Sequence, residues 1–142
     1  MEQKYNIQFD KEIPKVLYDN KISIVFSTYQ ASRLMIIGCT DGNILQQIPI
    51  PIKKPMGIAI RENELAVAAL DEIHFFSGET KLVDSLKYNE KKIDKVYVFR
   101  GSYNTSSLDI HDITFCNNEL WGVNTLFSCL CTFSFLILFL IK

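Results

Sequence analysis

Short apolar runs separated by turn residues occupy the chain from Lys21 onward. The run KISIVFSTYQ is rich in β-branched and aromatic residues, and RLMIIGC, ILQQIPI, GIAI, LAVAAL and IHFF follow it. Between the second and third runs, TDGN (40–43) contains an Asp-Gly pair, which favours a hairpin turn. Prolines 49, 51 and 55 exclude a long helix and suit an edge strand or a loop. This pattern predicts an all-β fold.

Two segments of the chain match each other at an offset of 55 residues. MGIAIRENELAVAALDEIHFFS starts at Met56, and HDITFCNNELWGVNTLFSCLCTFS starts at His111. The alignment superposes Asn63-Glu64-Leu65 on Asn118-Glu119-Leu120 and, with two extra residues in the second copy, Phe76-Ser77 on Phe133-Ser134. Ile58 also falls on Ile113, and Ile60 on Phe115. We expect Asn-Glu-Leu to form a tight turn between two strands, because Asn tolerates a left-handed backbone.

A repeated unit of strands and turns, with a period of roughly 40 to 55 residues, is typical of β-propeller blades. We therefore predict an all-β chain that forms an incomplete β-propeller-type repeat of about two to three antiparallel blades. The expected boundaries are an N-terminal polar segment at 1–20, the propeller-like region at 21–134 and an apolar C-terminal tail at 135–142.

The charge and cysteine content exclude several classes of function. Fifteen Lys and Arg residues against 16 Asp and Glu give a net charge of -1, so we expect no nucleic-acid partner. The four cysteines lack the spacing of a disulfide framework. Cys129 and Cys131 form a C-x-C pair, but no second pair completes a zinc tetrad, so we predict no metal site. The sequence identifies no cofactor.

The N-terminal sequence MEQKYNIQFDKEIPK is polar where a secretory signal peptide needs an apolar stretch. We therefore expect a cytoplasmic protein.

The segment LDIHDITF (108–115) contains the strongest candidates for catalysis, which are His111, Asp109 and Asp112. If Ile110 faces the core, strand alternation places Asp109, His111 and Ile113 on one side and Asp112 on the other. Asp109 would then orient His111 as a general base or metal ligand, with Ser128 or Cys129 as a nucleophile. The alternative is that these polar groups brace the blade through hydrogen bonds.

Other polar residues are candidates for ligand binding at strand ends. Tyr29 and Gln30 end the first strong strand, Asn124 and Thr125 end a later one, and Ser128 follows shortly after. Such side chains also commonly satisfy turn amides. We interpret His74 as a hydrogen-bonded strand residue and Trp121 as a packing residue between blades.

The C-terminal region has no charged residue from Leu120 to Ile141. A helix over these 22 residues would be about 33 Å long, close to the thickness of a bilayer core. That length predicts a possible membrane segment at 120–141. However, LWGVNT belongs to the repeat, and the remaining 16 apolar residues (126–141) would span only about 24 Å. The competing hypothesis is a truncated or frameshifted propeller with an accidental apolar tail.

Four blocks of the chain carry a family resemblance: FSTYQASRLMIIG, PMGIAI, LDIHDITF and LWGVNTLFSCL. In this order they resemble a conserved-hypothetical, mostly bacterial family, a domain of unknown function with propeller-like strands. The resemblance runs from about Phe26 to Leu130 and implies the fold. It implies no established reaction, and it implies longer relatives with further repeats.

These observations favour an uncharacterised propeller-type protein, a truncated binding or interaction scaffold with no assignable activity. Its partner would be an unidentified small molecule or protein. One alternative is a propeller enzyme that acts on a small ligand through His111 and Asp109. The other is a tail-anchored membrane protein.

Overall fold

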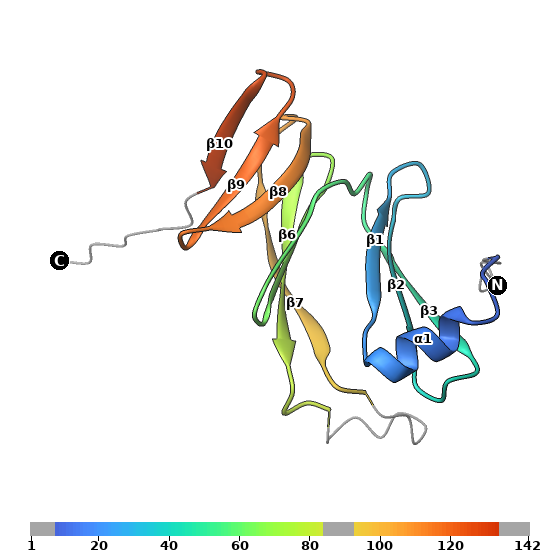
Figure 1. Cartoon of the computed structure of the whole chain (residues 1–142). Coiled ribbons are helices and arrows are strands. Elements are labelled where there is room, and N and C mark those ends of the chain that lie inside the picture. The colour runs from blue at the N-terminus through green and yellow to red at the C-terminus, as the bar shows by residue number, and fades with distance from the viewer. Residues whose placement is uncertain (1–7, 84–92, 134–142) are drawn as a thin grey trace.

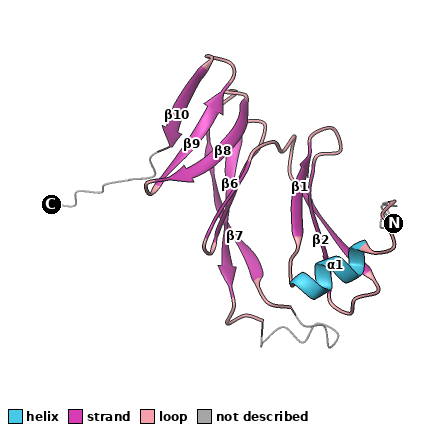
Figure 2. Ribbon diagram, in the orientation of Figure 1, coloured by secondary structure: helices cyan, strands magenta, loops and turns pink. Residues whose placement is uncertain are grey.

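The computed structural model describes residues 8–83 and 93–133, which form three antiparallel sheets and one short helix (Figures 1 and 2). Strands that follow one another in the chain pair within each sheet, and no sheet closes on itself. The prediction of a mainly β chain is therefore confirmed. The predicted apolar tail (135–142) lies outside the described residues.

The first sheet consists of β1 (Ile24–Thr28), β2 (Arg33–Cys39) and β3 (Leu45–Pro51). The predicted Asp-Gly turn joins β2 to β3, with Gly42 at a φ of 77°. The Asp41 carboxylate accepts hydrogen bonds from the backbone N–H groups of Ile44 and Asn43, which lower its pKa. Prolines 49 and 51 lie on β3, whose one partner among residues 8–83 and 93–133 is β2, so their predicted place on an edge strand is confirmed there.

A helix, α1 (Ile13–Asn20), precedes this sheet and lies within the predicted N-terminal polar segment (1–20). Pro14 occupies its first turn, where a missing N–H costs little, and Lys21 ends it in a left-handed conformation. Leu17 is buried, and α1 packs against β2. Only two apolar positions of this short helix are buried, Pro14 and Leu17, which is too weak a pattern to predict it.

The two matching segments form the corresponding strands of the other two sheets. The middle sheet consists of β4 (Ile58–Arg61), β5 (Glu64–Ala68), β6 (Glu72–Glu79) and β7 (Val96–Asn104). The third consists of β8 (Ile110–Cys116), β9 (Glu119–Asn124) and β10 (Cys129–Phe133). Leu65 pairs with Phe76 in the middle sheet, and Leu120 pairs with Phe133 in the third, as the self-match aligns them.

The predicted turn lies between the first two strands of each unit. In the second copy Asn117 and Asn118 both have left-handed backbones, with φ of 48° and 65°. This pair matches the turn type that best follows the twist of a hairpin. In the first copy the left-handed residue is Glu62, with a φ of 51°. The turn is thus confirmed, although different residues adopt the left-handed conformation in the two copies.

The middle sheet lies between the other two (Figure 1), and its strand β5 is buried on both faces. Toward the first sheet it presents Leu65, Val67 and Phe76, which pack in one cluster with Leu34 and Ile52. Toward the third sheet it presents smaller residues and Ile73, which pack with residues of β8, β9 and β10. These residues of the second cluster are Ala59, Ala66, Ala68 and Ile73 on the middle sheet, and Ile110, Ile113, Leu120 and Phe133 on the third.

The structure corrects the helical interpretation of the membrane-segment window. Residues 120–133 of that window form β9, a turn and β10, because their apolar side chains pair and pack in a sheet. The remainder of the window lies outside the described residues. Within 8–83 and 93–133, no helix is long and apolar enough to cross a bilayer.

Candidate functional site at the loop end

The loops at one end of the three sheets are joined by backbone hydrogen bonds. The N–H groups of Ile52, Leu70, Thr105 and Thr125 donate to the carbonyl groups of Ser32, Lys53, Asp71 and Asp109, over 2.9 to 3.2 Å. We call this end of the molecule, with residues 29–32, 52–57, 69–71, 105–109 and 125–128, the loop end. The candidate residues from the sequence lie in these loops or directly beside them: Tyr29, Gln30, Asp109, His111, Asp112, Asn124, Thr125 and Ser128.

At the loop end, β8 begins with a bulge at His111. Ile110 pairs with Asn124 and Asp112 pairs with Val123, so His111 is an extra residue on β8. Because the bulge shifts the alternation by one position, Ile110 and Ile113 pack in the same core cluster. The expectation that Ile113 shares the side of Asp109 and His111, opposite Ile110, is therefore wrong. His111 and Asp112 are both exposed beside the bulge.

Asp109 contacts both His111 and Thr125. Its backbone is left-handed, with a φ of 52°, and its Oδ2 lies 3.4 Å from His111 Nε2. The Thr125 hydroxyl donates to the Asp109 carbonyl oxygen at 2.7 Å and lies 3.0 Å from Oδ2. Asp109 and His111 are thus near each other, as the sequence suggested. The shorter contacts of Asp109, however, hold the ends of β8 and β9 together.

The remaining candidates of the third sheet serve the β9–β10 turn. Asn124 is 4% exposed, and its Oδ1 accepts a hydrogen bond from the Phe127 N–H at 3.1 Å. Ser128 closes the turn with a left-handed backbone, and its N–H points to the Thr125 carbonyl. Among the described residues no hydrogen bond joins His111 to Ser128 or Cys129. This geometry favours turn stabilisation over a preformed nucleophile and base.

Tyr29 and Gln30 lie at the loop end of the first sheet. Tyr29 is 42% exposed, and the Lys54 ammonium lies 5.3 Å from the centre of its ring. Tyr29 and Gln30 follow a strand of the first sheet, whereas Asp109 and His111 belong to the start of the third sheet. The predicted ligand-binding residues therefore come from two different sheets.

A further polar group lies on the middle sheet, and of its members the sequence pointed to His74 but not to Glu72 or Ser102. Glu72 Oε1 lies 2.9 Å from His74 Nε2, and His74 pairs across the sheet with Ser102 of β7. The Ser102 hydroxyl, followed by the charges of His74 and Lys53, lowers the pKa of the Glu72 carboxyl. The signal available in the sequence was the Glu-x-His spacing, which places both side chains on one face of a strand.

The His74 ring also lies against aromatic side chains. Its centre is 5.6 Å from that of Phe99 and 6.5 Å from that of Phe76. The half-buried imidazole therefore packs within its own sheet. The ring contacts, together with the approach of Nε2 to Glu72 Oε1, give His74 a packing role on its strand. Its expected hydrogen bonding stays a prediction.

The cysteines do not assemble with other ligands. Cys129 and Cys131 lie on one side of β10, and burial raises the pKa of the Cys131 thiol. Across the described part of the chain, no three His, Cys, Asp or Glu residues are grouped as metal ligands.

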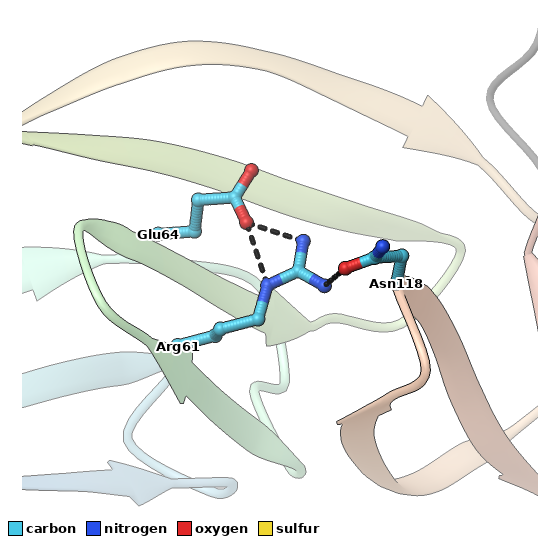
Figure 3. A network of polar contacts seen from close by, with 3 residues as sticks. All are labelled: Arg61, Glu64 and Asn118. Atoms are coloured by element: carbon cyan, nitrogen blue, oxygen red, sulfur yellow. Dashed lines mark hydrogen bonds and ion pairs between the residues drawn. The ribbon is translucent and has the colours of Figure 1, made fainter.

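A polar network joins the two repeated turns at the opposite end of the sheets (Figure 3). The Arg61 guanidinium bonds to Glu64 Oε2 through Nε at 3.0 Å and Nη2 at 2.5 Å, and its Nη1 lies 3.4 Å from Asn118 Oδ1. It also lies 4.4 Å from the centre of the Phe115 ring. Arg61 and Glu64 flank the first turn, and Asn118 belongs to the second. The network therefore connects the two repeats.

Comparison with known proteins identifies a family for this chain. No curated protein and no solved structure matches the chain. One family model does match, over residues 11–140, which includes all of the described strands. The chain therefore belongs to the family described as a domain of unknown function (DUF4915).

Proposed function

We propose that this chain is a propeller-type binding scaffold and not an enzyme. The observation that carries this proposal is the direction in which the sheets stack. Ile58, Leu65, Val67 and Phe76 of the middle sheet pack toward the first sheet. The residues aligned with them, Ile113, Leu120, Gly122 and Phe133, lie on the face of the third sheet that packs toward the middle one.

The same face of each unit thus packs on the unit before it. Such head-to-tail stacking of antiparallel meanders is how propeller blades follow one another. The close approach of β4 to β8 agrees with this arrangement, because a Cβ added to Gly57 would lie 2.6 Å from the Asp112 Cα. Propellers commonly bind partners with loops gathered at one end, and the loop end has that position here.

The contacts of Asp109 support a scaffold over the enzymatic alternative. Asp109 and His111 are both about half exposed, at 51% and 54% of their side chains, and 3.4 Å apart. The nucleophile expected beside this pair was Ser128 or Cys129, and among the described contacts neither is hydrogen-bonded to Asp109 or His111. Thr125, in contrast, makes two contacts with Asp109. We therefore assign Asp109 to bracing the loop end, where a small molecule or a protein would bind.

The experiment compares the stability of three variants by urea unfolding. Asp109→Ala and Thr125→Val remove the two sides of the brace, and we expect each to lower the free energy of unfolding by about 1 kcal/mol. His111→Asn is the matched control in the same exposed bulge, with an expected change below about 0.5 kcal/mol. If Asp109→Ala leaves stability unchanged, the brace is not the role of Asp109, and the His111–Asp109 enzyme becomes the better hypothesis.

A further inference from the structure

We propose that the Asp41-Gly42 bond in the turn between β2 and β3 is a site of backbone isomerisation to isoaspartate, and that the Cys39 thiol slows this reaction in the folded chain. The turn lies at the end of the first sheet opposite the loop end. The inference therefore does not depend on the proposed binding function, which is tested by the stability of Asp109 and Thr125 variants.

The reaction joins the backbone nitrogen of Gly42 to the side chain of Asp41. The nitrogen attacks the Asp41 Cγ and loses its proton as the N–Cγ bond forms, and the protonated carboxyl group releases one oxygen as water. The product is a cyclic imide. Water then opens the imide at either carbonyl group, which restores aspartate or leaves isoaspartate. The overall change is an isomerisation that uses no oxidant or reductant.

The residue pair in this turn is the one that chemistry favours for the reaction. An aspartate followed by glycine closes the ring most readily, because glycine has no side chain to shield its nitrogen. Asp41-Gly42 is the one Asp-Gly pair in the sequence, which has no Asn-Gly pair. The turn itself favours glycine, since Gly42 has a φ of 77°. Asp41 is exposed, so water reaches the reacting group.

The hydrogen bonds of the turn engage both reacting groups with other partners. Asp41 Oδ1 accepts the backbone N–H groups of Asn43 and Ile44, each at 2.8 Å. The Gly42 N–H donates to the Cys39 sulfur at 3.2 Å. Ring closure turns the Asp41 carboxyl group and the Gly42 nitrogen toward each other, so it competes with these contacts. The reaction should therefore proceed from a locally opened turn.

Cys39 contacts both of the groups that react. Its sulfur accepts the Gly42 N–H, and its S–H donates to Asp41 Oδ1 at 3.5 Å. Cys39 is the last residue of β2 and pairs with Leu45, the first residue of β3. The pairing of the two strands thus fixes the place of the sulfur. We assign Cys39 as a positioning residue that holds the reacting groups in their unreactive arrangement.

The same contacts favour the ionised form of Asp41, which does not release an oxygen as water. Hydrogen bonds from the Ile44 and Asn43 backbones, and a smaller contribution from Cys39, lower the pKa of the Asp41 carboxyl below its ordinary value of 3.8. The acid form that reacts is therefore rarer in the folded turn than in an open one.

The helix α1 restrains the turn from outside. A Cβ added to Gly42 would lie 3.4 Å from Cδ1 of Tyr18, so the Tyr18 ring lies directly beside Gly42. Rotation of the Asp41-Gly42 peptide toward the ring-closing geometry has little room on that side. Isoaspartate would also add a methylene group to the main chain within the turn, next to the pairing of Cys39 with Leu45.

The first experiment compares the isomerisation rate in the folded and the unfolded chain. The full chain is incubated at neutral pH, with and without guanidinium chloride. A protease that cleaves before aspartate but not before isoaspartate, followed by mass spectrometry, measures the product at residue 41. We expect the folded chain to react about tenfold more slowly, because it must first open the turn. Equal rates would overturn the proposal, since the turn would then give no protection.

The second experiment tests the role of Cys39 with three variants. Cys39→Ala removes both thiol contacts, and we expect the folded chain to react about threefold faster. Cys39→Ser keeps a donor and an acceptor, so its rate should stay closer to that of the parent. Cys116→Ala is the matched control, because Cys116 is an exposed cysteine that also ends a strand before a turn. It should leave the rate unchanged.

Measurements in guanidinium chloride separate a positioning role from an effect on the chemistry itself, because all variants should then react at the parent's rate. An unchanged folded rate in Cys39→Ala would contradict the role of Cys39. A slower rate would also contradict it, and would make the thiol a proton relay from the Gly42 nitrogen to the Asp41 carboxyl group. If Cys39→Ala does not fold, the comparison of Cys39→Ser with the parent replaces it. A Cys39→Ser rate equal to the rate in guanidinium chloride would then count against the proposal.

Discussion

The middle and third sheets share one strand unit, yet they differ in how many of its faces are covered. In the middle sheet Leu65 and Val67 on one face and Ala66 and Ala68 on the other are at most 1% exposed. In the third sheet Leu120 is as deeply buried, whereas Val123 and Leu130 on the opposite face are 38% and 68% exposed. The apolar residues that the two copies share therefore lie on the face that packs against the preceding sheet, which we call the backward face.

The opposite face, which we call the forward face, carries different residues in the two copies. The size of these side chains depends on whether another sheet packs against them. Ala66 and Ala68 of β5 align with Trp121 and Val123 of β9. Small residues let the third sheet approach the middle one closely, whereas no described sheet limits the size of side chains on the forward face of β9. Residue size on this face thus depends on the neighbouring sheet and not on the strand itself.

The largest loss of stability is expected when a large side chain on the backward face is shortened to alanine. Leu65→Ala and Leu120→Ala each remove a side chain that is 1% exposed, so each should lower the free energy of unfolding by about 3 kcal/mol. Urea unfolding measures both, and Leu126→Ala, at a 59% exposed position, is the control. If Leu120→Ala costs less than about 1 kcal/mol, the backward faces of the two units are not equivalent.

A smaller but more specific effect is expected at Gly57 and Asp112, which occupy the same position of the two copies. An alanine at 57 would bring its Cβ within 3 Å of the β8 backbone, so Gly57→Ala should force β4 and β8 apart and cost about 2 kcal/mol. Asp112→Asn changes the exposed counterpart and keeps the oxygen that accepts the Ile113 N–H. It should stay within about 0.5 kcal/mol. Equal losses of stability in the Gly57→Ala and Asp112→Asn variants would contradict the inference that the two sheets differ in how closely their forward faces are packed.

Smaller changes in side-chain size on the forward face test the same difference in packing between the middle and third sheets. Ala68→Val adds two methyl groups where Ala68 is fully buried, and overpacking should cost about 1.5 kcal/mol. Val123→Ala is the reverse change at the aligned position, which is 38% exposed, and it should cost less than about 0.5 kcal/mol. Thermal unfolding of the two variants side by side gives the answer. A larger loss for Val123→Ala would mean that the forward face of the third sheet is covered in solution.

Much of the fold was predictable because strand periodicity and turn chemistry are local. The runs RLMIIGC and ILQQIPI, the Asp-Gly turn and the Asn-Glu-Leu turn all lie where the sequence placed them. The self-match also aligned Phe133 with Phe76, and the structure pairs these two residues with the equivalent residues Leu120 and Leu65. The helix at Ile13–Asn20 was missed, since its burial depends on contact with β2 and not on a strong pattern of its own.

The candidate site was predicted only in part, because a bulge cannot be read from alternation. The sequence placed Asp109 near His111, and the structure agrees at 3.4 Å. The extra residue on β8 reverses the faces that follow it, so Ile113 joins the core. The link between Thr125 and Asp109 crosses 16 residues of chain and depends on the register of β8 and β9. No local pattern contains that register.

The smallest effect we predict is a difference in acid sensitivity between β6 and β10. With the two extra residues of the second copy, Glu72 and His74 align with Cys129 and Cys131, so only β6 carries a carboxylate at this position. Hydrogen bonding by Ser102 and the charge of His74 place the folded pKa of Glu72 below its ordinary value of 4.5. A lowered pKa contributes stability that is fully present above about pH 4.5 and is lost as the pH falls through the folded pKa.

Since Glu72 is partly exposed, this contribution should be about 0.5 kcal/mol. Glu72→Gln should remove it, so that the variant and the parent differ at pH 6 and converge at about pH 3 in urea unfolding. Ser102→Ala should produce most of the same change, because Ser102 belongs to β7, the strand that β10 lacks among the described residues. A constant difference between the Glu72→Gln variant and the parent from pH 6 to pH 3 would mean that the Glu72 carboxylate is not stabilised by its neighbours. In that case the covering strand would contribute packing alone to the middle sheet.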